Sequence, residues 1–183
     1  MDEKQLLTAC LHGDKKAQKK LYETYAPKMY GVCLRYAKDE DTAQDYLQEG
    51  FVRVFTHLGK FRQEGSFEGW VRRIMVNTAL EKLRKTDIFK HSLELETTAH
   101  NTPDAVQLTD QLDVADLLHL IQSLPTGFRT VFNLYAIEGF THQEIGEMMH
   151  ISEGTSKSQY SRARQWLQTR LNKKEKHDGE AAG

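Results

Sequence analysis

Apolar residues recur at every third or fourth position through most of the chain, and this helical spacing limits the possible folds more than any other feature. Leu21, Tyr25, Met29 and Val32, for example, fall on one stripe of a predicted helix. No segment shows the sustained alternation of apolar and polar residues that marks a half-buried strand. The chain is therefore predicted to be all-α.

The distribution of charge divides the chain into two parts. From His91 to Phe128 there is no Lys or Arg, and the first half of this stretch is polar and weakly periodic, as expected of a linker. At 183 residues the chain is longer than one compact domain requires. We therefore expect two small helical domains, 1–90 and 110–176, joined by a flexible acidic linker, 91–109, and followed by a disordered tail, 177–183.

Local signals predict where the helices begin and end. In the first domain the predicted helices run from Asp14 to about Lys38, from the Asp39–Asp41 turn through Phe55, and from Ser66 to about Lys85. In the second they begin near Asp110, at Pro125, at Thr141 and at Glu153, the last ending near Asn172.

Composition excludes several classes of function. No apolar run could cross a bilayer, and the Met1–Lys4 segment lacks the pattern of a signal peptide, so we expect a cytoplasmic protein without direct membrane insertion. Cys10 and Cys33 lack CxxC spacing and are interpreted as buried free thiols. Because no HExxH, P-loop or GxSxG motif occurs, we expect no enzyme, no cofactor and no metal site, and a helical enzyme is the least supported alternative.

The segment from Thr141 to Ser152 has the pattern of a helix-turn-helix. Thr141 and Glu144 form a capping box, Gly146 permits close helix crossing, and Ser152 can cap a second helix. On that second helix, apolar Tyr160, Ala163, Leu167 and Leu171 form one stripe. The opposite stripe holds hydrogen-bonding residues: Thr155, Ser158, Gln159 and Arg162. Cations outnumber acids from there to the C-terminus, which suits DNA, although an ordinary helical hairpin would also fit the pattern.

Two clusters in the first domain also suggest binding. Arg73 and Asn77 share a helix face beside a glycine-containing loop and near Phe67 and Trp70, a combination that suits single-stranded nucleic acid. Aromatic residues at helical spacing are, however, more often part of a hydrophobic core than platforms for bases. The acids from Asp39 to Glu49 could dock a basic partner or simply form a solvated face. The formal net charge of −1, which on average argues against nucleic-acid binding, is thus a cancellation of local charges.

Three segments, in order, resemble a known family. Residues 42–55 resemble the core-binding region 2.2 of bacterial RNA polymerase sigma factors, residues 69–77 their promoter-melting segment, and residues 124–167 their region 4. A region 2 and a region 4 joined by a short acidic linker, without region 3, is the order of the extracytoplasmic-function (ECF) sigma factors. The resemblance covers about residues 15 to 170.

That resemblance implies a transcription initiation factor whose partners are core RNA polymerase, promoter DNA and an anti-sigma factor. The implied polymerase contacts are Asp45, Gln48 and Glu49. The implied −10 contacts, with a flipped base held by the Gln63–Phe67 loop, are Gln63, Gly65, Ser66, Phe67, Arg72, Arg73 and Asn77. The implied −35 contacts are Thr155, Ser158, Gln159 and Arg162 to bases, and Lys157 and Arg164 to phosphates.

The chain departs from the family pattern at a few positions. Gln159 and Ser161 stand where relatives commonly have Arg and His, and His150 replaces a turn glycine, which predicts a positive φ there. Gln44 replaces an acid in the docking helix. The alternative function is a stand-alone helix-turn-helix regulator with an N-terminal sensor or dimerisation domain.

Overall fold

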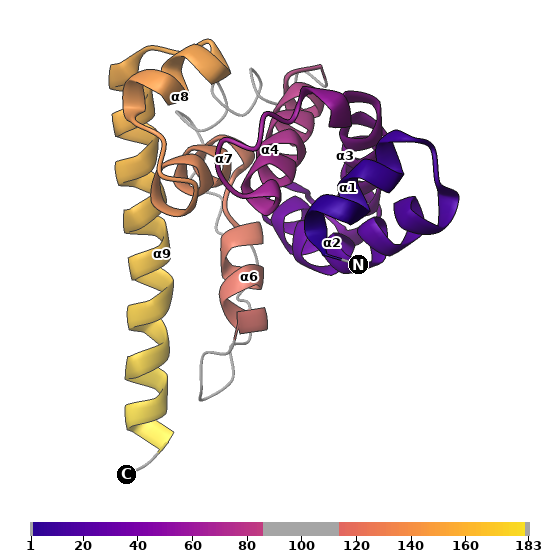
Figure 1. Cartoon of the computed structure of the whole chain (residues 1–183). Helices are drawn as coiled ribbons and strands as arrows, with labels where there is room; N and C mark the ends of the chain where they lie inside the picture. The colour runs from indigo at the N-terminus through magenta and orange to yellow at the C-terminus, as the bar shows by residue number, and fades with distance from the viewer. Residues whose placement is uncertain (1, 86–113, 182–183) are drawn as a thin grey trace. The chain divides into compact units, whose positions relative to one another are not determined.

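The computed structural model describes residues 2–85 and 114–181 (Figure 1). Within these ranges the chain forms helices joined by short turns, and no strand occurs. The chain divides into two compact units, residues 1–82 and 83–183. The prediction of an all-α protein with two small domains is confirmed.

The first unit is a helical bundle. Its elements are α1 (Glu3–Leu11), α2 (Lys15–Tyr36), α3 (Glu40–His57), the 3-10 turn η1 (Leu58–Lys60) and α4 (Phe67–Lys85). Aspartates start the first three helices, because the carboxylates of Asp2, Asp14 and Asp39 each accept hydrogen bonds from the free amides of the first turn. The predicted starts of α2 and α3 are thus confirmed, whereas no bounds were predicted for α1.

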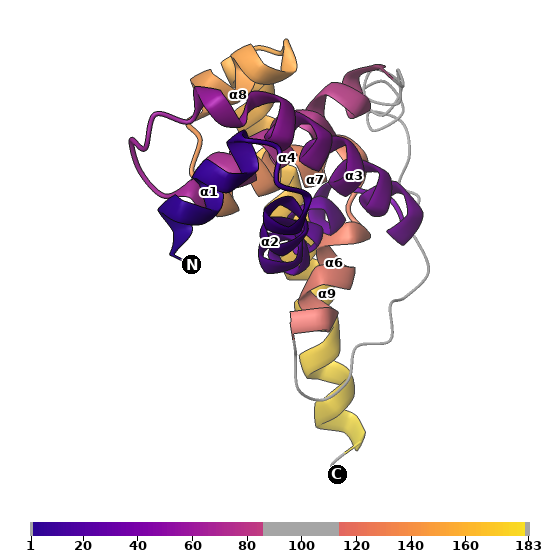
Figure 2. The same cartoon turned by 45° about the vertical axis from the view of Figure 1, so that its right-hand side comes forward.

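The core of the first unit lies where α2, α3 and α4 meet (Figures 1 and 2). Leu21, Met29 and Tyr36 of α2 and Val54 of α3 are completely or almost completely buried. Gly50 lies so close to Met75 of α4 that a Cβ there would be only 2.1 Å from the Met75 sulfur. A larger residue at position 50 would therefore force the end of the buried Met75 side chain to move.

The second unit is built on one long helix. Its elements are α6 (Val114–Gln122), α7 (Thr126–Phe132), the π-helical turn η2 (Asn133–Ile137), α8 (His142–Met149) and α9 (Glu153–Ala181). Both α7 and α8 pack against α9. One cluster of its buried core consists of Leu120, Leu124, Phe128, Ala163 and Leu167.

The structure extends or departs from the predicted boundaries at several points. α9 continues to Ala181, beyond the expected end near Asn172 and through most of the stretch 177–183 that was predicted to be a disordered tail. The π-helical turn after α7 was not predicted. The linker, 91–109, and the expected helix start near Asp110 lie outside the described residues. No described helix is long and apolar enough to cross a membrane.

Candidate nucleic-acid interface

Helix α8 begins at the predicted capping box. The Thr141 hydroxyl accepts a hydrogen bond from the Glu144 amide at 3.2 Å, and the Glu144 carboxylate accepts one from the Thr141 amide at 2.8 Å. The bond from the Thr141 amide and a further one from its hydroxyl lower the pKa of Glu144 below its ordinary value. Two free amides at the helix start are thereby satisfied.

The turn between α8 and α9 is as tight as the sequence indicates. His150 has a φ of +57°, a left-handed conformation that glycine adopts at less cost, as predicted from its place in the turn. A Cβ on Gly146 would lie 2.8 Å from the Ile151 carbonyl oxygen, so only glycine fits there. Ser152 caps α9, because its hydroxyl accepts from the Thr155 amide at 3.0 Å. The prediction of a helix-turn-helix is confirmed.

The outward face of α9 is polar and basic. Its first four turns expose Lys157, Ser158, Ser161, Arg162, Arg164 and Gln165, and leave Thr155 half-buried. Lys157 forms an ion pair with Glu153 at 2.6 Å, one turn earlier on the helix. Five of the six residues predicted for the −35 element therefore have at least partial access to solvent.

Gln159 corrects the sixth prediction. It is only 3% exposed and faces α7, where its side-chain oxygen would meet a Cβ on Gly127 at 3.1 Å. That oxygen, Oε1, is buried without a hydrogen-bond partner within the described residues. Gln159 therefore belongs to the packed side of α9 and cannot reach a base in this conformation.

Gln165 and Ser161 are exposed residues in the first four turns of α9 that the sequence-based selection missed. Both lie near the middle of the outward face, and Gln165 supplies an amide of the kind first assigned to Gln159. The signal was available in the helical spacing, since Gln165 lies seven residues after Ser158 on the same stripe. Residue type could not separate Gln165 from Gln159, because both are glutamines and Gln159 lies at the border of the apolar stripe.

An aromatic cluster joins α8 to α9 and the π-helical turn. The rings of Tyr135 and His142 stack at 4.2 Å, Tyr160 lies 4.5 Å from Tyr135, and His142 Nδ1 is 2.9 Å from the Ser156 hydroxyl. Burial, and then the nearby Lys157 charge, lower the pKa of His142. These contacts fix the angle at which the two helices of the motif meet.

In the first unit, the loop before α4 has an unusual backbone. Gln63 has a φ of +60° and Gly65 a φ of +101°. For Gln63 this left-handed conformation is strained, a condition that clusters at functional sites. Ser66 caps α4, because its hydroxyl accepts from the Gly69 amide at 3.1 Å. Gln63, Gly65 and Ser66, all predicted −10 contacts, are exposed together on this loop.

Phe67 does not share their exposure. It is 1% exposed, and its ring contacts those of Tyr25, Phe61 and Trp70 at 5.2 to 5.6 Å. The expectation that Phe67 touches DNA is therefore corrected. Phe67 is a buried core residue next to the loop. Of the two interpretations that the sequence left open for this aromatic residue, nucleic-acid contact and hydrophobic core, the second is correct.

Helix α4 exposes the remaining predicted −10 residues unequally. Arg73 and Asn77 are exposed one turn apart on the same face. Arg72 is half-buried and engaged in interactions within the chain. Arg73 and Asn77 are therefore the better placed of the three for a polar ligand.

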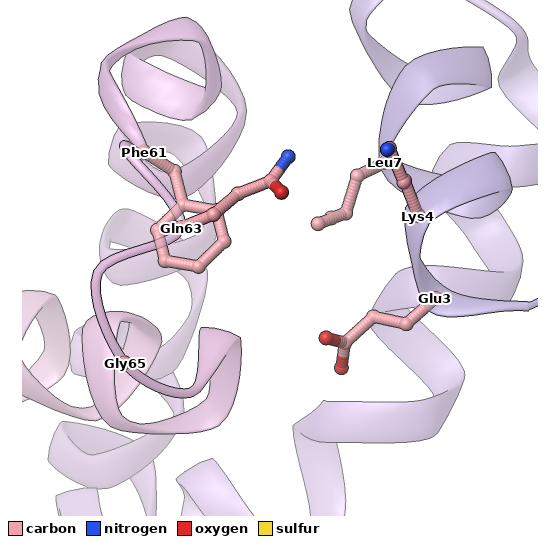
Figure 3. Close-up of a pocket in the computed structure, with 6 residues that line it drawn as sticks. All are labelled: Glu3, Lys4, Leu7, Phe61, Gln63 and Gly65. Carbon is pink, nitrogen blue, oxygen red and sulfur yellow. The ribbon is translucent and has the colours of Figure 1, made fainter.

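A cleft opens beside the strained loop (Figure 3). It has a volume of about 230 Å³ and lies between the loop and the start of α1. Figure 3 shows Gln63 extending from the loop toward α1, and Glu3 and Leu7 extending from α1 toward the loop. Phe61, Gly65 and Lys4 complete the lining. A hollow with both apolar and polar walls is suited to one small ligand group.

The three residues of α3 that were predicted to contact polymerase fall into two groups. Asp45 and Gln48 are exposed. Glu49 is half-buried in an ion network, 2.6 Å from Arg53 and 2.5 Å from Lys82, while Arg53 also contacts Glu81 at 2.6 Å. The hydrogen bond from Lys82 holds the pKa of Glu49 below its ordinary value, against the opposing effect of burial. Glu49 therefore joins α3 to α4, whereas Asp45 and Gln48 face outward.

Comparison with known proteins places both units in one family. Residues 21–88 match the Sigma-70 region 2 model, and residues 115–167 match the Sigma-70, region 4 model. The chain is 30% identical to the RNA polymerase sigma-H factor of Pseudomonas aeruginosa over 92% of this chain and 93% of that protein. It is 31% identical to the ECF RNA polymerase sigma-E factor of Haemophilus influenzae over 87% of this chain and 89% of that protein.

A solved structure shares the fold. The sigma factor RpoE from Bartonella quintana, in complex with the anti-sigma factor NepR, is similar with a TM-score of 0.52 and 20% identity, covering 84% of this chain and 96% of that one. At that identity the likeness supports the fold alone. The two family models, in this order, and the extended similarity to curated relatives carry the assignment. The chain therefore belongs to the ECF sigma factors of the sigma-70 family and is a transcription initiation factor.

Proposed function

We propose that this chain binds core RNA polymerase, directs it to promoters through −10 and −35 elements, and promotes melting of the DNA. The observation that supports this most is the pairing of two different binding faces. One is a basic, hydrogen-bonding recognition helix, and the other is a strained polar loop beside a small cleft. The factor performs no catalysis itself and acts in the cytoplasm, where polymerase and chromosomal DNA are found.

At the −35 element, α9 would enter the major groove with its N-terminal half. Ser158, Ser161 and Arg162 are exposed and would face base edges, and arginine pairs best with guanine. Lys157 and Arg164 flank this stripe and would contact phosphates, which position the helix without reading sequence. Binding at this element would consequently weaken as salt is raised.

At the −10 element, the Gln63–Ser66 loop would hold a base flipped out of the duplex. Extruding a base costs about a few kcal/mol of unstacking and unpairing. Capture of the base in the cleft, with Arg73 and Asn77 contacting the adjacent single strand, would offset that cost. Melting would thus be driven by binding and would need no hydrolysed cofactor.

Polymerase binding is assigned to the outward face of α3. Asp45 and Gln48 present a charged and a hydrogen-bonding group two turns and one turn before Val52, which is 65% exposed. A basic partner surface would be complementary to Asp45 and its acidic neighbours. Glu49 would contribute by fixing α3 on α4 rather than by touching polymerase. The similar solved structure, RpoE of Bartonella quintana, is a complex with an anti-sigma factor. We propose that this chain also binds an anti-sigma factor.

The test compares promoter binding with and without core polymerase. A sigma factor should give sequence-specific gel shifts and transcripts only when core enzyme is present, and Asp45→Arg should abolish co-purification with it. Tight, specific binding of duplex promoter DNA by the free chain would instead identify the stand-alone regulator. Unchanged polymerase binding by Asp45→Arg would remove the assignment of α3.

A further inference from the structure

The outward face of α3 continues beyond its acidic residues onto exposed apolar side chains. Asp45, Gln48 and Val52 are spaced by three and four residues, so they lie on one stripe of the helix. Leu11 of α1 adjoins the end of this stripe, because its Cδ2 atom would lie 3.7 Å from a Cβ on Gly59. Val52 and Leu11 are 65% and 55% exposed, the highest values among the large hydrophobic residues that the structure describes. The first unit therefore carries two apolar anchors on one side.

The start of α2 borders this apolar part of the stripe. The ring of Tyr22 lies 4.6 Å from that of Phe51, which lies 6.1 Å from the ring of half-buried Phe55. Lys15 and Lys19 precede Tyr22 by seven and three residues, so they share its side of α2. Because a short connection joins α2 to α3, the two helices run in opposite directions, side by side (Figures 1 and 2). The two lysines therefore lie toward the C-terminal end of α3.

The lysines at the start of α2 contribute little to the fold. Lys15 and Lys16 lie in the first turn, where the helix dipole disfavours positive charge. The side chains of Lys15, Lys16 and Lys20 make no hydrogen bond or ion pair within residues 2–85 and 114–171. Lys19 pairs with Glu23 at 3.7 Å, but the two side chains are 76% and 62% exposed, so the pair adds little stability. Binding to a partner accounts for these cations better than helix stability does.

The order of charge along this side indicates the kind of partner. We define the docking strip as seven residues of α3, α1 and α2, in this order: Asp45, Gln48, Val52, Phe55, Leu11, Lys15 and Lys19. Nucleic-acid phosphates would engage the lysines but would gain nothing from the exposed apolar side chains. A protein interface, by contrast, combines an apolar centre with a charged rim. A complementary protein surface would carry its charges in the reverse order, which fixes its orientation.

We propose that core RNA polymerase binds the whole docking strip, with a basic group at Asp45, an apolar group at Val52 and Leu11, and an acidic group at Lys15 and Lys19. This inference rests on the proposed role of α3 in polymerase binding and adds α1 and the start of α2 to that surface. Leu11, Lys15 and Lys19 all precede residue 21, where the Sigma-70 region 2 match begins. They therefore extend the interface beyond the matched region.

The test measures the affinity of the whole chain for core polymerase, without DNA, by fluorescence anisotropy over a salt series. The basic end is reversed in the double variant Lys15→Glu with Lys19→Glu. Its matched control is Lys16→Glu with Lys20→Glu, which changes the same helix and net charge but lies about 100° further round α2. Leu11→Ala removes apolar surface, and its control Leu11→Met retains that surface. Thermal unfolding verifies that every variant is folded.

The two kinds of variant should differ in how their losses depend on salt. Reversal of Lys15 and Lys19 should weaken polymerase binding about tenfold at low salt, and the loss should shrink as salt screens the charges. Leu11→Ala should weaken binding several-fold at every salt concentration, because burial of apolar surface is not screened. Leu11→Met and the Lys16 and Lys20 control should bind like the wild type.

Other outcomes separate this inference from the function on which it rests. If Asp45→Arg abolishes polymerase binding while the Lys15 and Lys19 reversal and Leu11→Ala retain it, α3 binds polymerase and the extension is overturned. An equal loss in the lysine control would identify net charge as the cause and would also overturn it. Retained polymerase affinity with lost binding to DNA, or to vesicles containing anionic lipid, would assign the lysines to that partner instead. If the wild type does not bind core polymerase, the proposed function itself fails.

Discussion

At the scale of single residues, burial decides which polar side chains can function at a surface. Gln159 and Gln165 are chemically identical and lie on the same helix, yet one is 3% exposed and the other faces solvent. Phe67 shows the same effect, since it lies next to the exposed Gln63–Ser66 loop but is buried against Phe61. Residue type alone therefore suggests which chemistry is present, and packing determines where it is available.

Replacing Gln159 with methionine tests its buried position. The Oε1 atom has no partner within the described region, and replacing an unpaired buried polar group with an apolar group of similar length and shape is neutral or stabilising. Gln159→Met should therefore leave the free energy of unfolding unchanged or raise it by up to about 1 kcal/mol. Chemical denaturation measures this, and transcription from −35 variants should keep the wild-type preference. A changed preference would show that Gln159 reaches the DNA.

Arg162 is the residue whose removal should alter base preference most. Arg162→Ala should cost about 1 to 3 kcal/mol of discrimination at one −35 position, because the guanidinium can form two bonds to guanine. Transcription from promoters substituted at each −35 position measures the loss. Lys157→Ala serves as the comparison, since a phosphate contact should weaken all promoters alike. A uniform loss with Arg162→Ala would reassign it to phosphate binding.

At the scale of elements, short-range contacts hold the binding helices in position. Glu49 joins α3 to α4 through Lys82 and Arg53, and the His150 turn sets the approach of α8 to α9. The ion pairs of Glu49 constrain how α3 packs on α4, and the positive φ of His150 costs conformational energy. The sequence predicted the second feature but not the first. Each can be altered without touching an outward-facing residue.

The Glu49 network should contribute stability that depends on pH. Because the folded state lowers the pKa of Glu49 below 4.5, this contribution is present above that value and is lost as pH falls through the lower folded pKa. Glu49→Gln should destabilise the protein by about 1 kcal/mol at pH 7, and the difference from wild type should shrink below pH 4.5. Denaturation across this pH range measures it.

Asp45→Asn is the control for Glu49→Gln. Exposed Asp45 should affect polymerase binding without affecting the free energy of unfolding. If Glu49→Gln instead leaves stability intact at pH 7 and loses polymerase binding, Glu49 is a direct contact rather than a link between helices.

The left-handed His150 should be replaceable with a gain in stability. Glycine adopts a φ of +57° without steric penalty, so His150→Gly should raise the free energy of unfolding by about 1 kcal/mol. His150→Ala removes the same ring but keeps the Cβ, and should give no such gain. Equal effects of the two substitutions in thermal unfolding would show that the side chain, not the backbone, is responsible.

At the scale of the whole molecule, charge is segregated along the chain. The totals of 25 basic and 26 acidic residues nearly cancel, but the His91–Phe128 stretch lacks cations and α9 is rich in them. Such segregation lets an acidic segment compete with DNA for basic surfaces. We therefore propose that the linker acids reduce the binding of free factor to DNA.

Neutralising those acids tests this proposal. The combined change Glu94→Gln, Glu96→Gln and Asp104→Asn should increase the affinity of the free chain for duplex DNA several-fold at low salt, and the gain should fade as salt rises. Gel shifts over a salt series measure it. Neutralising three acids elsewhere, at Glu23, Asp41 and Glu147, is the control. An equal gain in DNA affinity in the control would show that the total net charge, and not the position of the acids in the linker, is responsible.

The sequence by itself determined the helical fold, the two units, the capping box at Thr141, the turn at His150 and the family. These depend on interactions between residues close together in the chain, whose spacing and type are visible in one dimension. Only the tertiary structure placed Gln159 and Phe67 in the core, bound Glu49 to Lys82, and set α1 opposite Gln63. Those outcomes depend on which helices pack together, because contacts between distant segments determine the exposure and the partners of each side chain.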